Sequence, residues 1–362
     1  MRVALVAGVN PWSPRASGIR SYVVGLADAL RRLGHEVSVI GAGRVLANGL
    51  SYRFLSVCRD ANPSTALFER SLVTHGNTLP LGDAIVHAQR PDDLAALLLR
   101  DGVRARILTI HGMSYRGIRE RHGWMAAAGF RVLERTGVRS ADRIVVLDPM
   151  TLRELTETYP AVTGRIASVP AGVDLDQFQI LPRPEARRAL GLPDVSTAAF
   201  VGRLAPEKNL SVVLEAVAAS GVGQLVIAGD GPLRGLIESA SFPRLGIHFL
   251  GAVEHSRIPL VLNAAECLVL PSHREAMPSV CLESLACGTP VVATQVGGLT
   301  EIIRDGVNGF LTTASLQDFA RGVEKAVDGS DRMRQACRAS VEQFGWDHVA
   351  TQMVRVYEEA SS

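Results

Sequence analysis

Cysteine is scarce in this sequence, and no two cysteines have the spacing of a metal or redox motif. The five cysteines, at positions 58, 267, 281, 287 and 337, are odd in number and include no Cys-x-x-Cys pair. This usage argues against a disulfide scaffold and against a zinc site, and it favours reduced thiols. We therefore expect no structural metal.

Long apolar runs and a leader segment are missing as well. The chain enters a strand at Arg2 without a charged n-region and an apolar h-region, and no apolar run reaches the length of a membrane-spanning helix. The expectation is a cytoplasmic protein, either free or working at the inner face of the membrane.

Lysine is almost absent, although basic residues are common. Only Lys208 and Lys325 are lysines among 38 basic residues, and the net charge of +2 gives no reason to expect nucleic acid binding. The charge is uneven, because residues 1–180 hold 22 arginines against 16 acids (+6) and the remainder holds 16 basic and 20 acidic residues (−4). A lysine inside a strand-to-helix loop therefore stands out, since a compact ammonium suits a crowded phosphate.

The N-terminal segment has the pattern of a βαβ unit but lacks a dinucleotide fingerprint. Arg2–Gly8 is typical of a buried parallel strand, Ile19–Leu33 of an amphipathic helix, and His35–Ile40 of a second strand. No Gly-x-Gly-x-x-Gly follows the first strand, and no acid follows the second, so NAD binding is disfavoured. The loop Ala16-Ser17-Gly18 could still present backbone N–H groups to a phosphate, or it could be a plain turn.

The most informative stretch runs from Leu268 to Thr294. It predicts a strand (268–270), a helix (279–287) with Pro278 fitting its first turn and Gly288 ending it, and a second strand (291–293). Glu275 lies in the loop before the helix and Glu283 lies within it. Two carboxylates at this separation, beside free helix N–H groups, can bracket a polyhydroxy ligand, although either acid alone could be an ordinary surface residue.

Other loops at strand ends carry candidate ligand-binding groups. GRLAPEKN (202–209) and AGDGP (228–232) each follow a predicted strand, and Arg203 can fork two phosphate oxygens. His87 and His111 each end a strand in the first half, at the edge where open α/β sheets bind ligands. A structural histidine and a tight glycine turn are the alternatives at these positions.

Taken together, the ordered motifs resemble the retaining glycosyltransferases of family 4. The resemblance covers nearly the whole chain and rests on Glu275 and Glu283 with GRLAPEKN and AGDGP upstream. It implies the GT-B fold, an α/β architecture of two Rossmann-like, doubly wound parallel-sheet domains. The implied limits are an acceptor-binding domain at 1–180, a sugar-nucleotide domain at 181–345 joined through a linker at Gln179 to Pro184, and a C-terminal helix at 346–362 that packs back on the first domain.

The resemblance also implies a role for each matching residue. The donor sugar nucleotide would be held by the diphosphate-binding pair Arg203 and Lys208, by Glu283 at the ribose and by Glu275 at the transferred sugar. The other implied donor-site positions are Gly18, Gly202, Gly229, Leu250, Ala276, Met277 and Pro278, and the implied catalytic set is His111, Arg203, Lys208 and Glu275. No metal or other cofactor is implied, and Asp174-Leu-Asp176 is interpreted as part of the family's Gly-Val-Asp run rather than as a metal site.

The resemblance implies transfer of a sugar to a hydroxyl of a glycan, lipid-linked or small-molecule acceptor. The favoured donor is a UDP-sugar, and GDP-mannose is the next candidate. Another GT-B reaction, such as nucleotide-sugar epimerisation or phosphorolysis, and a non-catalytic sugar-nucleotide binder are the alternatives. Segments 42–80 and 112–135, where the acceptor would be chosen, have the weakest patterns. The arginine-rich stretch 115–139 could contact an anionic membrane or could be a core-facing helix with a basic outer face.

Overall fold

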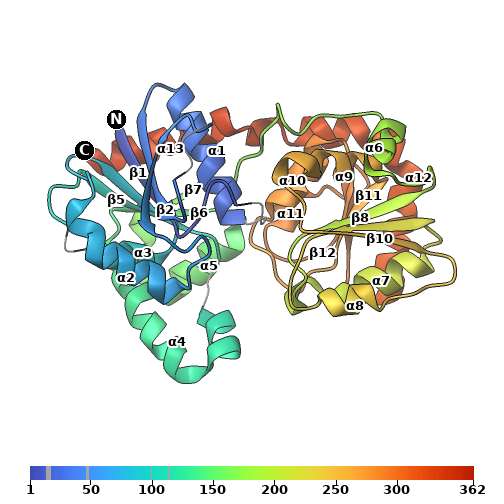
Figure 1. The fold of residues 1–362 in the computed structure, drawn as a ribbon, viewed down its shortest axis with the longest axis horizontal. Coiled ribbons are helices and arrows are strands. Elements are labelled where there is room, and N and C mark those ends of the chain that lie inside the picture. The colour runs from blue at the N-terminus through green and yellow to red at the C-terminus, as the bar shows by residue number, and fades with distance from the viewer. Residues whose placement is uncertain (14–17, 46–48, 99, 113–114) are drawn as a thin grey trace. The chain divides into compact units, whose positions relative to one another are not determined.

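The computed structural model describes residues 1–13, 18–45, 49–98, 100–112 and 115–362, and its chain divides into two compact units. The first unit contains the described residues of Met1–Ser13, Ser17–Ala171 and Trp346–Ser362, and the second contains Gly172–Gly345 (Figure 1). The chain enters the second unit before the expected linker, because Val173 bridges Gly345 and Phe178 is fully buried.

A sheet of seven parallel strands forms the centre of the first unit, in the order β3-β2-β1-β4-β5-β6-β7. Four of the five residues of β1 are buried, which confirms a strand that is apolar on both faces. The strands are β1 (Arg2–Val6), β2 (Glu36–Ala42), β3 (Arg53–Cys58), β4 (Ile85–Ala88), β5 (Ala105–Ile110), β6 (Arg143–Val146) and β7 (Ile166–Ser168). Strand β1 has a parallel neighbour on each side, since Arg2 lies opposite Glu36 of β2 and Val3 lies opposite Ile85 of β4. The strand order therefore runs outward from β1 in both directions, which makes the sheet doubly wound.

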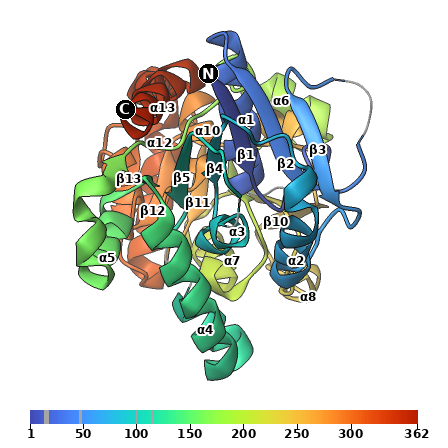
Figure 2. The same ribbon diagram turned by 90° about the vertical axis from the view of Figure 1, so that its left-hand side faces the viewer.

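Helices connect these strands and cover the sheet. They are α1 (Gly18–Arg32), α2 (Thr65–His75), α3 (Pro91–Ala96), α4 (Tyr115–Ser140), α5 (Pro149–Thr158) and α13 (Trp346–Ser361), with short 3₁₀ turns at Gly76–Thr78 and Pro160–Arg165. Side-chain caps fix two of the starts, since Ser64 accepts from the Leu67 N–H and Asp148 accepts from the Thr151 N–H. Both views show α4 projecting beyond the rest of this unit (Figures 1 and 2).

The final helix belongs to the first unit, as the sequence predicted. Helix α13 packs against α1 and β5, and Val349, Met353 and Tyr357 on its inner face are fully buried. The Tyr357 hydroxyl lies 2.7 Å from Nδ1 of His87, whose Nε2 lies 2.6 Å from the Thr109 hydroxyl. His87 is therefore a core histidine that ties α13 to the sheet, and burial lowers its pKa to about 3.

The second unit is built on six parallel strands in the order β10-β9-β8-β11-β12-β13. The strands are β8 (Thr197–Val201), β9 (Gln224–Ala228), β10 (Gly246–Gly251), β11 (Cys267–Leu270), β12 (Val291–Thr294) and β13 (Gly309–Thr312). The helices are α6 (Arg183–Leu190), α7 (Leu210–Ala219), α8 (Arg234–Glu238), α9 (Ile258–Ala264), α10 (Ser279–Ala286), α11 (Leu299–Ile302) and α12 (Leu316–Ser340), with 3₁₀ turns at Pro206–Lys208, His255–Arg257 and Glu342–Phe344. This sheet is doubly wound about β8, so the predicted fold class is confirmed for both units.

One detail of the second unit differs from the sequence-based prediction. Pro278 lies at the position before the first residue of α10 rather than within its first turn. Residues 306–308 form a turn that leads into β13, where Gly309 pairs with Val291 and a Cβ on Gly309 would lie 2.1 Å from the Val291 carbonyl oxygen.

Candidate functional site

The loops after β8 and β11 leave the second sheet at the point where its strand order reverses. Strand β8 pairs with β9 on one side and with β11 on the other. In doubly wound sheets, ligands bind outside the carboxyl ends of the strands at such a point. Residues 202–209 and 271–278, the two motif loops predicted from the sequence, both start there.

An ion pair joins these two loops. Nζ of Lys208 contacts Oε1 of Glu275, and the Ser272 hydroxyl donates to the same oxygen over 2.7 Å. The pair is sheltered, since the side chains of Lys208 and Glu275 are 19% and 9% exposed. A backbone hydrogen bond from His273 to Glu207 (2.9 Å) also links the loops. The structure therefore brings together two predicted site residues that are far apart in the sequence.

Arg203 lies in the same loop as Lys208 but has a different partner. Its guanidinium pairs with Glu207 of its own loop, and both side chains are largely exposed. Directly after Lys208 the backbone turns at Asn209, which has a left-handed φ of 52°. The ammonium group of Lys208 is thus sheltered beside Glu275, whereas the guanidinium group of Arg203, beside Glu207, is open to solvent.

Glycines let the strand ends approach one another closely. A Cβ on Gly229 would lie 1.8 Å from the Gly202 carbonyl oxygen, and the Gly229 N–H donates to the Gly251 carbonyl over 2.7 Å. Only glycine avoids this clash between the ends of β8 and β9. Leu250 lies where the register of β10 against β9 shifts, so the ladder is irregular at this predicted donor-site position.

Glu283 is buried in α10 and has a partner that the sequence analysis missed. Nε2 of His255 lies 3.0 Å from Oε1 of Glu283, and the Gln177 side-chain amide donates to the His255 carbonyl over 3.0 Å. The ring of Phe178 meets His255 edge-on at 5.3 Å. No sequence signal marks His255, because it belongs to a short turn with no motif of its own.

The backbone after Glu275 is fixed by a neighbouring glycine pair. The Gly298 N–H donates to the Ala276 carbonyl, and a Cβ on Gly297 would lie 1.6 Å from the Glu275 carbonyl oxygen. Ala276, Met277 and Pro278 then lead directly into α10. The loop that carries Glu275 is thus packed against the turn that follows β12.

The remaining predicted residues belong to the first unit. His111 follows β5, with its Nε2 2.9 Å from Oε1 of Gln89 and its ring edge-on to Tyr22 at 4.9 Å. Burial lowers the pKa of His111 to about 4, so the imidazole is neutral near pH 7. Gly18 is the exposed first residue of α1, whereas Ala16 and Ser17 of the predicted phosphate loop lie outside the described residues.

Acidic residues do not gather into a cation site in the part of the chain that the structure describes. No group of three or more His, Cys, Asp or Glu side chains could hold a metal ion there. Asp174 of the Asp-x-Asp sequence accepts the backbone N–H groups of Asp176 (3.0 Å) and Gln177 (2.9 Å). Its carboxylate thus stabilises a local turn.

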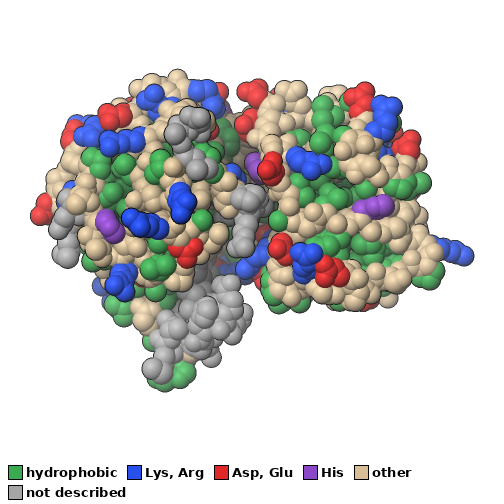
Figure 3. Space-filling view, viewed as in Figure 1, with side chains coloured by type: hydrophobic (Ala, Val, Ile, Leu, Met, Phe, Trp, Pro, Cys, Tyr) green, Lys and Arg blue, Asp and Glu red, His purple; other side chains and the backbone are tan. Residues whose placement is uncertain are grey.

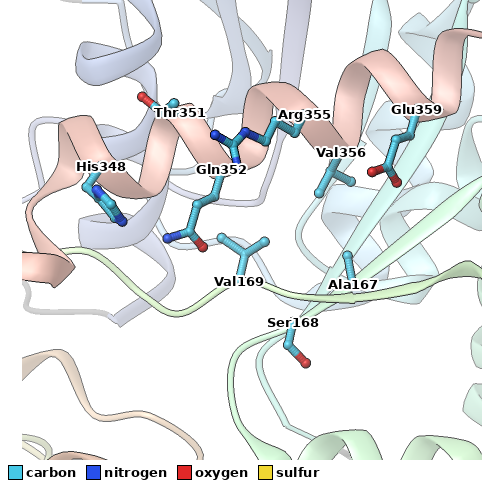
Figure 4. A pocket seen from close by; sticks show the side chains of 9 residues that line it. All are labelled: Ala167, Ser168, Val169, His348, Thr351, Gln352, Arg355, Val356 and Glu359. Carbon is cyan, nitrogen blue, oxygen red and sulfur yellow. The ribbon is translucent and has the colours of Figure 1, made fainter.

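A separate pocket of about 360 Å³ lies in the first unit, between the end of β7 and α13. Figure 4 shows Gln352 and Val356 extending from the helix toward Val169 and Ala167. Arg355 and Glu359 also line this pocket, but none of the predicted site residues does. The motif residues therefore define the candidate site at the sheet edge, not in this pocket.

Comparison with known proteins identifies the family of the chain. The family model described as glycosyl transferases group 1 matches residues 182–343, and that described as Glycosyltransferase Family 4 matches residues 16–177. A D-inositol 3-phosphate glycosyltransferase of Thermobispora bispora is 34% identical over 406 aligned positions, covering 97% of this chain and 92% of the relative. One from Mycolicibacterium paratuberculosis is 35% identical, covering 63% of this chain and 55% of the relative. The match thus spans little more than half the length of the latter.

Solved structures share the fold at low sequence identity. Sucrose-phosphate synthase from Thermosynechococcus elongatus superposes with a TM-score of 0.83 at 21% identity, covering 99% of this chain and 98% of the other. HepE from Anabaena, in complex with UDP, gives 0.73 at 17% identity, with 99% of each chain covered. Two doubly wound units with a returning final helix define the class, which is that of GT-B glycosyltransferases. Within that class, this chain belongs to glycosyltransferase family 4, whose members transfer a sugar from a nucleotide sugar.

Proposed function

We propose that the chain transfers a sugar, with retention of anomeric configuration, from a UDP-sugar to a hydroxyl acceptor, with GDP-mannose as the next candidate donor. The observation that carries the proposal is the sheltered Lys208–Glu275 pair at the strand-order reversal of the second unit. Such a pair offers a cation to a diphosphate and an anion to sugar hydroxyls at one place. Donor binding is expected to exchange this internal ion pair for contacts with the ligand.

The roles follow from the charge change in the reaction. The leaving nucleoside diphosphate gains negative charge, so Lys208 and Arg203 would stabilise the transition state more than the ground state. Glu275 and the backbone at 276–277 would hold the transferred sugar, and Glu283 would accept hydrogen bonds from the ribose. His111 would lie near the sugar, and Gly18 would assist the phosphate. The acceptor would attack from the face that the phosphate leaves, with the phosphate taking its proton.

These cations would neutralise the leaving group without a metal ion. The proposal therefore includes activity in the presence of a chelator. A covalent glycosyl–enzyme intermediate is not part of it, because the proposal assigns the Glu275 carboxylate to hydrogen bonds with hydroxyl groups of the transferred sugar.

For the acceptor, we propose a phosphorylated polyol before a glycan or a lipid-linked sugar. The name of the Thermobispora bispora relative, D-inositol 3-phosphate glycosyltransferase, supports this choice. The excess of six positive charges in residues 1–180 is also favourable for an anionic acceptor. Mass analysis of the products would separate transfer to an acceptor from donor epimerisation, which consumes no acceptor, and from phosphorolysis, which consumes phosphate.

Donor class can be tested by thermal unfolding with UDP, GDP and ADP and with their common sugar conjugates. A ligand at 100 times its Kd adds about 2.7 kcal/mol to the free energy of unfolding, so the midpoint rises by several degrees. We expect UDP and UDP-sugars to give the largest rise, equally with EDTA and with Mg²⁺. A Glu283→Ala variant is expected to lose this response, while a Glu301→Ala variant, changed at an exposed acid of α11, keeps it. A rise that requires Mg²⁺, or none with any nucleotide, would contradict the proposal.

No helix within the described residues is long and apolar enough to cross a membrane. We propose instead a peripheral contact through α4, which carries exposed apolar side chains at Trp124 (73% exposed), Val132 and Leu133. Arginines 131, 135 and 139 lie on the same helix, and further arginine side chains lie on the visible face of this unit (Figure 3). Aromatic and arginine side chains together suit an anionic bilayer surface.

Vesicle sedimentation at low salt tests this contact. Binding to vesicles with anionic lipid is expected, with little binding to neutral vesicles, and salt at a few hundred millimolar should release the protein because the charges are then screened. Trp124→Ser should weaken binding several-fold. The control Val195→Ser changes an exposed apolar residue of the second unit and should bind as the wild type does. Equal binding to neutral vesicles would rule out the electrostatic contact.

A further inference from the structure

Gln89 is a buried polar side chain that neither the motifs nor the proposed roles explain. It follows β4 directly, is 1% exposed, and its backbone N–H donates to the Val6 carbonyl over 3.0 Å. Strands β1 and β4 are neighbours at the strand-order reversal of the first sheet, so Gln89 lies at the edge where this unit would meet a ligand. Among the described residues its side chain makes one hydrogen bond, through Oε1 to Nε2 of His111.

The orientation of the Gln89 amide assigns the proton of His111. Its Oε1 faces the ring, and because a carbonyl oxygen can only accept, Nε2 of His111 is the donor in this orientation. In the neutral imidazole the lone pair then lies on Nδ1. Burial keeps this imidazole neutral, since it lowers the pKa of His111 to about 4. The neutral ring with an unprotonated Nδ1 can accept a hydrogen bond from a hydroxyl group.

The ring is also held sterically. Tyr22 of α1 meets it edge-on at 4.9 Å with an interplanar angle of 89°, and the ring of Trp346 packs against Tyr22 at 5.4 Å. Among the described residues, the titratable groups that face His111 are this Tyr22 and His87 of β4, and neither carries charge near neutral pH. No described carboxylate faces the ring, so Gln89 is the polar group that can set its tautomer.

We propose that Gln89 is a positioning residue: it holds His111 in the Nε2–H tautomer and so makes Nδ1 the acceptor for a hydroxyl of the transferred sugar. The assignment of the sugar as ligand rests on the function proposed above, whereas the tautomer does not. The other amide group of Gln89, its Nε2, has no hydrogen-bond partner among the described residues.

The tautomer can be read directly from nitrogen NMR of the full chain labelled with ¹⁵N-histidine, without any ligand. The His111 signals, assigned by their loss in His111→Asn, should show a protonated Nε2 and an unprotonated Nδ1 from pH 6 to 8. In Gln89→Met, which keeps size but removes the acceptor, the two tautomers should mix. A wild-type ring protonated on Nδ1, or unchanged signals in Gln89→Met, overturns the proposal.

Kinetics provide the second arm. Gln89→Met should lower kcat for sugar transfer about 10- to 100-fold with little change in KM for the donor, as expected when a reacting geometry is lost but donor binding elsewhere is kept. Gln89→Glu keeps an acceptor and hence the tautomer, but its carboxylate raises the pKa of His111. Because protonated His111 cannot accept a hydrogen bond, the acidic limb of the pH–rate profile should move up by about one pH unit or more. An unmoved limb contradicts the role.

Gln224→Met is the matched control. Gln224 is also 1% exposed and lies on β9 of the second unit. Its Nε2 donates to the Pro193 carbonyl and the Thr197 hydroxyl, while its Oε1 has no partner among the described residues. Gln224→Met should lose stability, as Gln89→Met does, but should leave the His111 NMR signals and the pH–rate profile unchanged. If the chain transferred no sugar at all, the NMR arm would still confirm or overturn the tautomer, so failure of the proposed function and failure of this inference remain distinct.

Discussion

Replacing Lys208 or Glu275 with alanine is expected to lower kcat/KM for sugar transfer at least ~100-fold, the size typical of losing one charged transition-state contact. Lys208 would lose its attraction to the departing diphosphate, and Glu275 its hydrogen bonds to the sugar. The two losses should differ in kind, because the charge that Lys208 compensates grows during the reaction. We expect kcat to fall most in Lys208→Ala, and both kcat and donor affinity to fall in Glu275→Ala.

The ion pair also predicts how the double variant Lys208→Ala/Glu275→Ala should behave. Each single change leaves a sheltered charge without its partner, and removing the second charge relieves that penalty. The combined loss in Lys208→Ala/Glu275→Ala should therefore be smaller than the product of the single losses. Lys325→Ala is the control, since Lys325 is the other lysine of the chain and lies on α12, outside the motif loops. Single variants that transfer sugar at near wild-type rates would remove both residues from the site.

The sequence predicted the second unit well because its site residues lie in loops tied to strand ends. Strands such as β8 and β11 are short buried apolar runs, and glycine or proline marks where each one ends. A residue just after such a strand must lie at the sheet's carboxyl edge, so Lys208 and Glu275 could be placed before any coordinates. Their direct contact could not, because it depends on the order of strands that are distant in the chain.

Partners contributed by other elements were not predictable. His255 reaches Glu283 from a short turn, and Gln89 reaches His111 from a neighbouring strand end, so no spacing within either segment reveals the pair. The strand and helix of segment 42–80 were not predictable from the sequence either. Its β3 is an edge strand with mixed burial, and α2 buries only Phe68 and Leu72, so neither has a clear apolar period.

Gly297→Ala is expected to lower kcat/KM about 100-fold although residue 297 carries no reactive group. Gly297 has a left-handed φ of 51°, and a Cβ there would lie 1.6 Å from the Glu275 carbonyl oxygen. The loop that holds Glu275 must therefore move, and displacement by about an ångström is enough for a loss of this size.

Gly306→Ala separates displacement from backbone strain, because Gly306 has a φ of 73° but no neighbouring atom within 4 Å of the place that a Cβ would take. Both variants should lose roughly 1–2 kcal/mol from the left-handed conformation, measured by denaturant unfolding, but Gly306→Ala should keep its activity. Equal activity in the two variants would show that the Glu275 loop tolerates the shift, and that the position of this carboxylate does not limit the reaction.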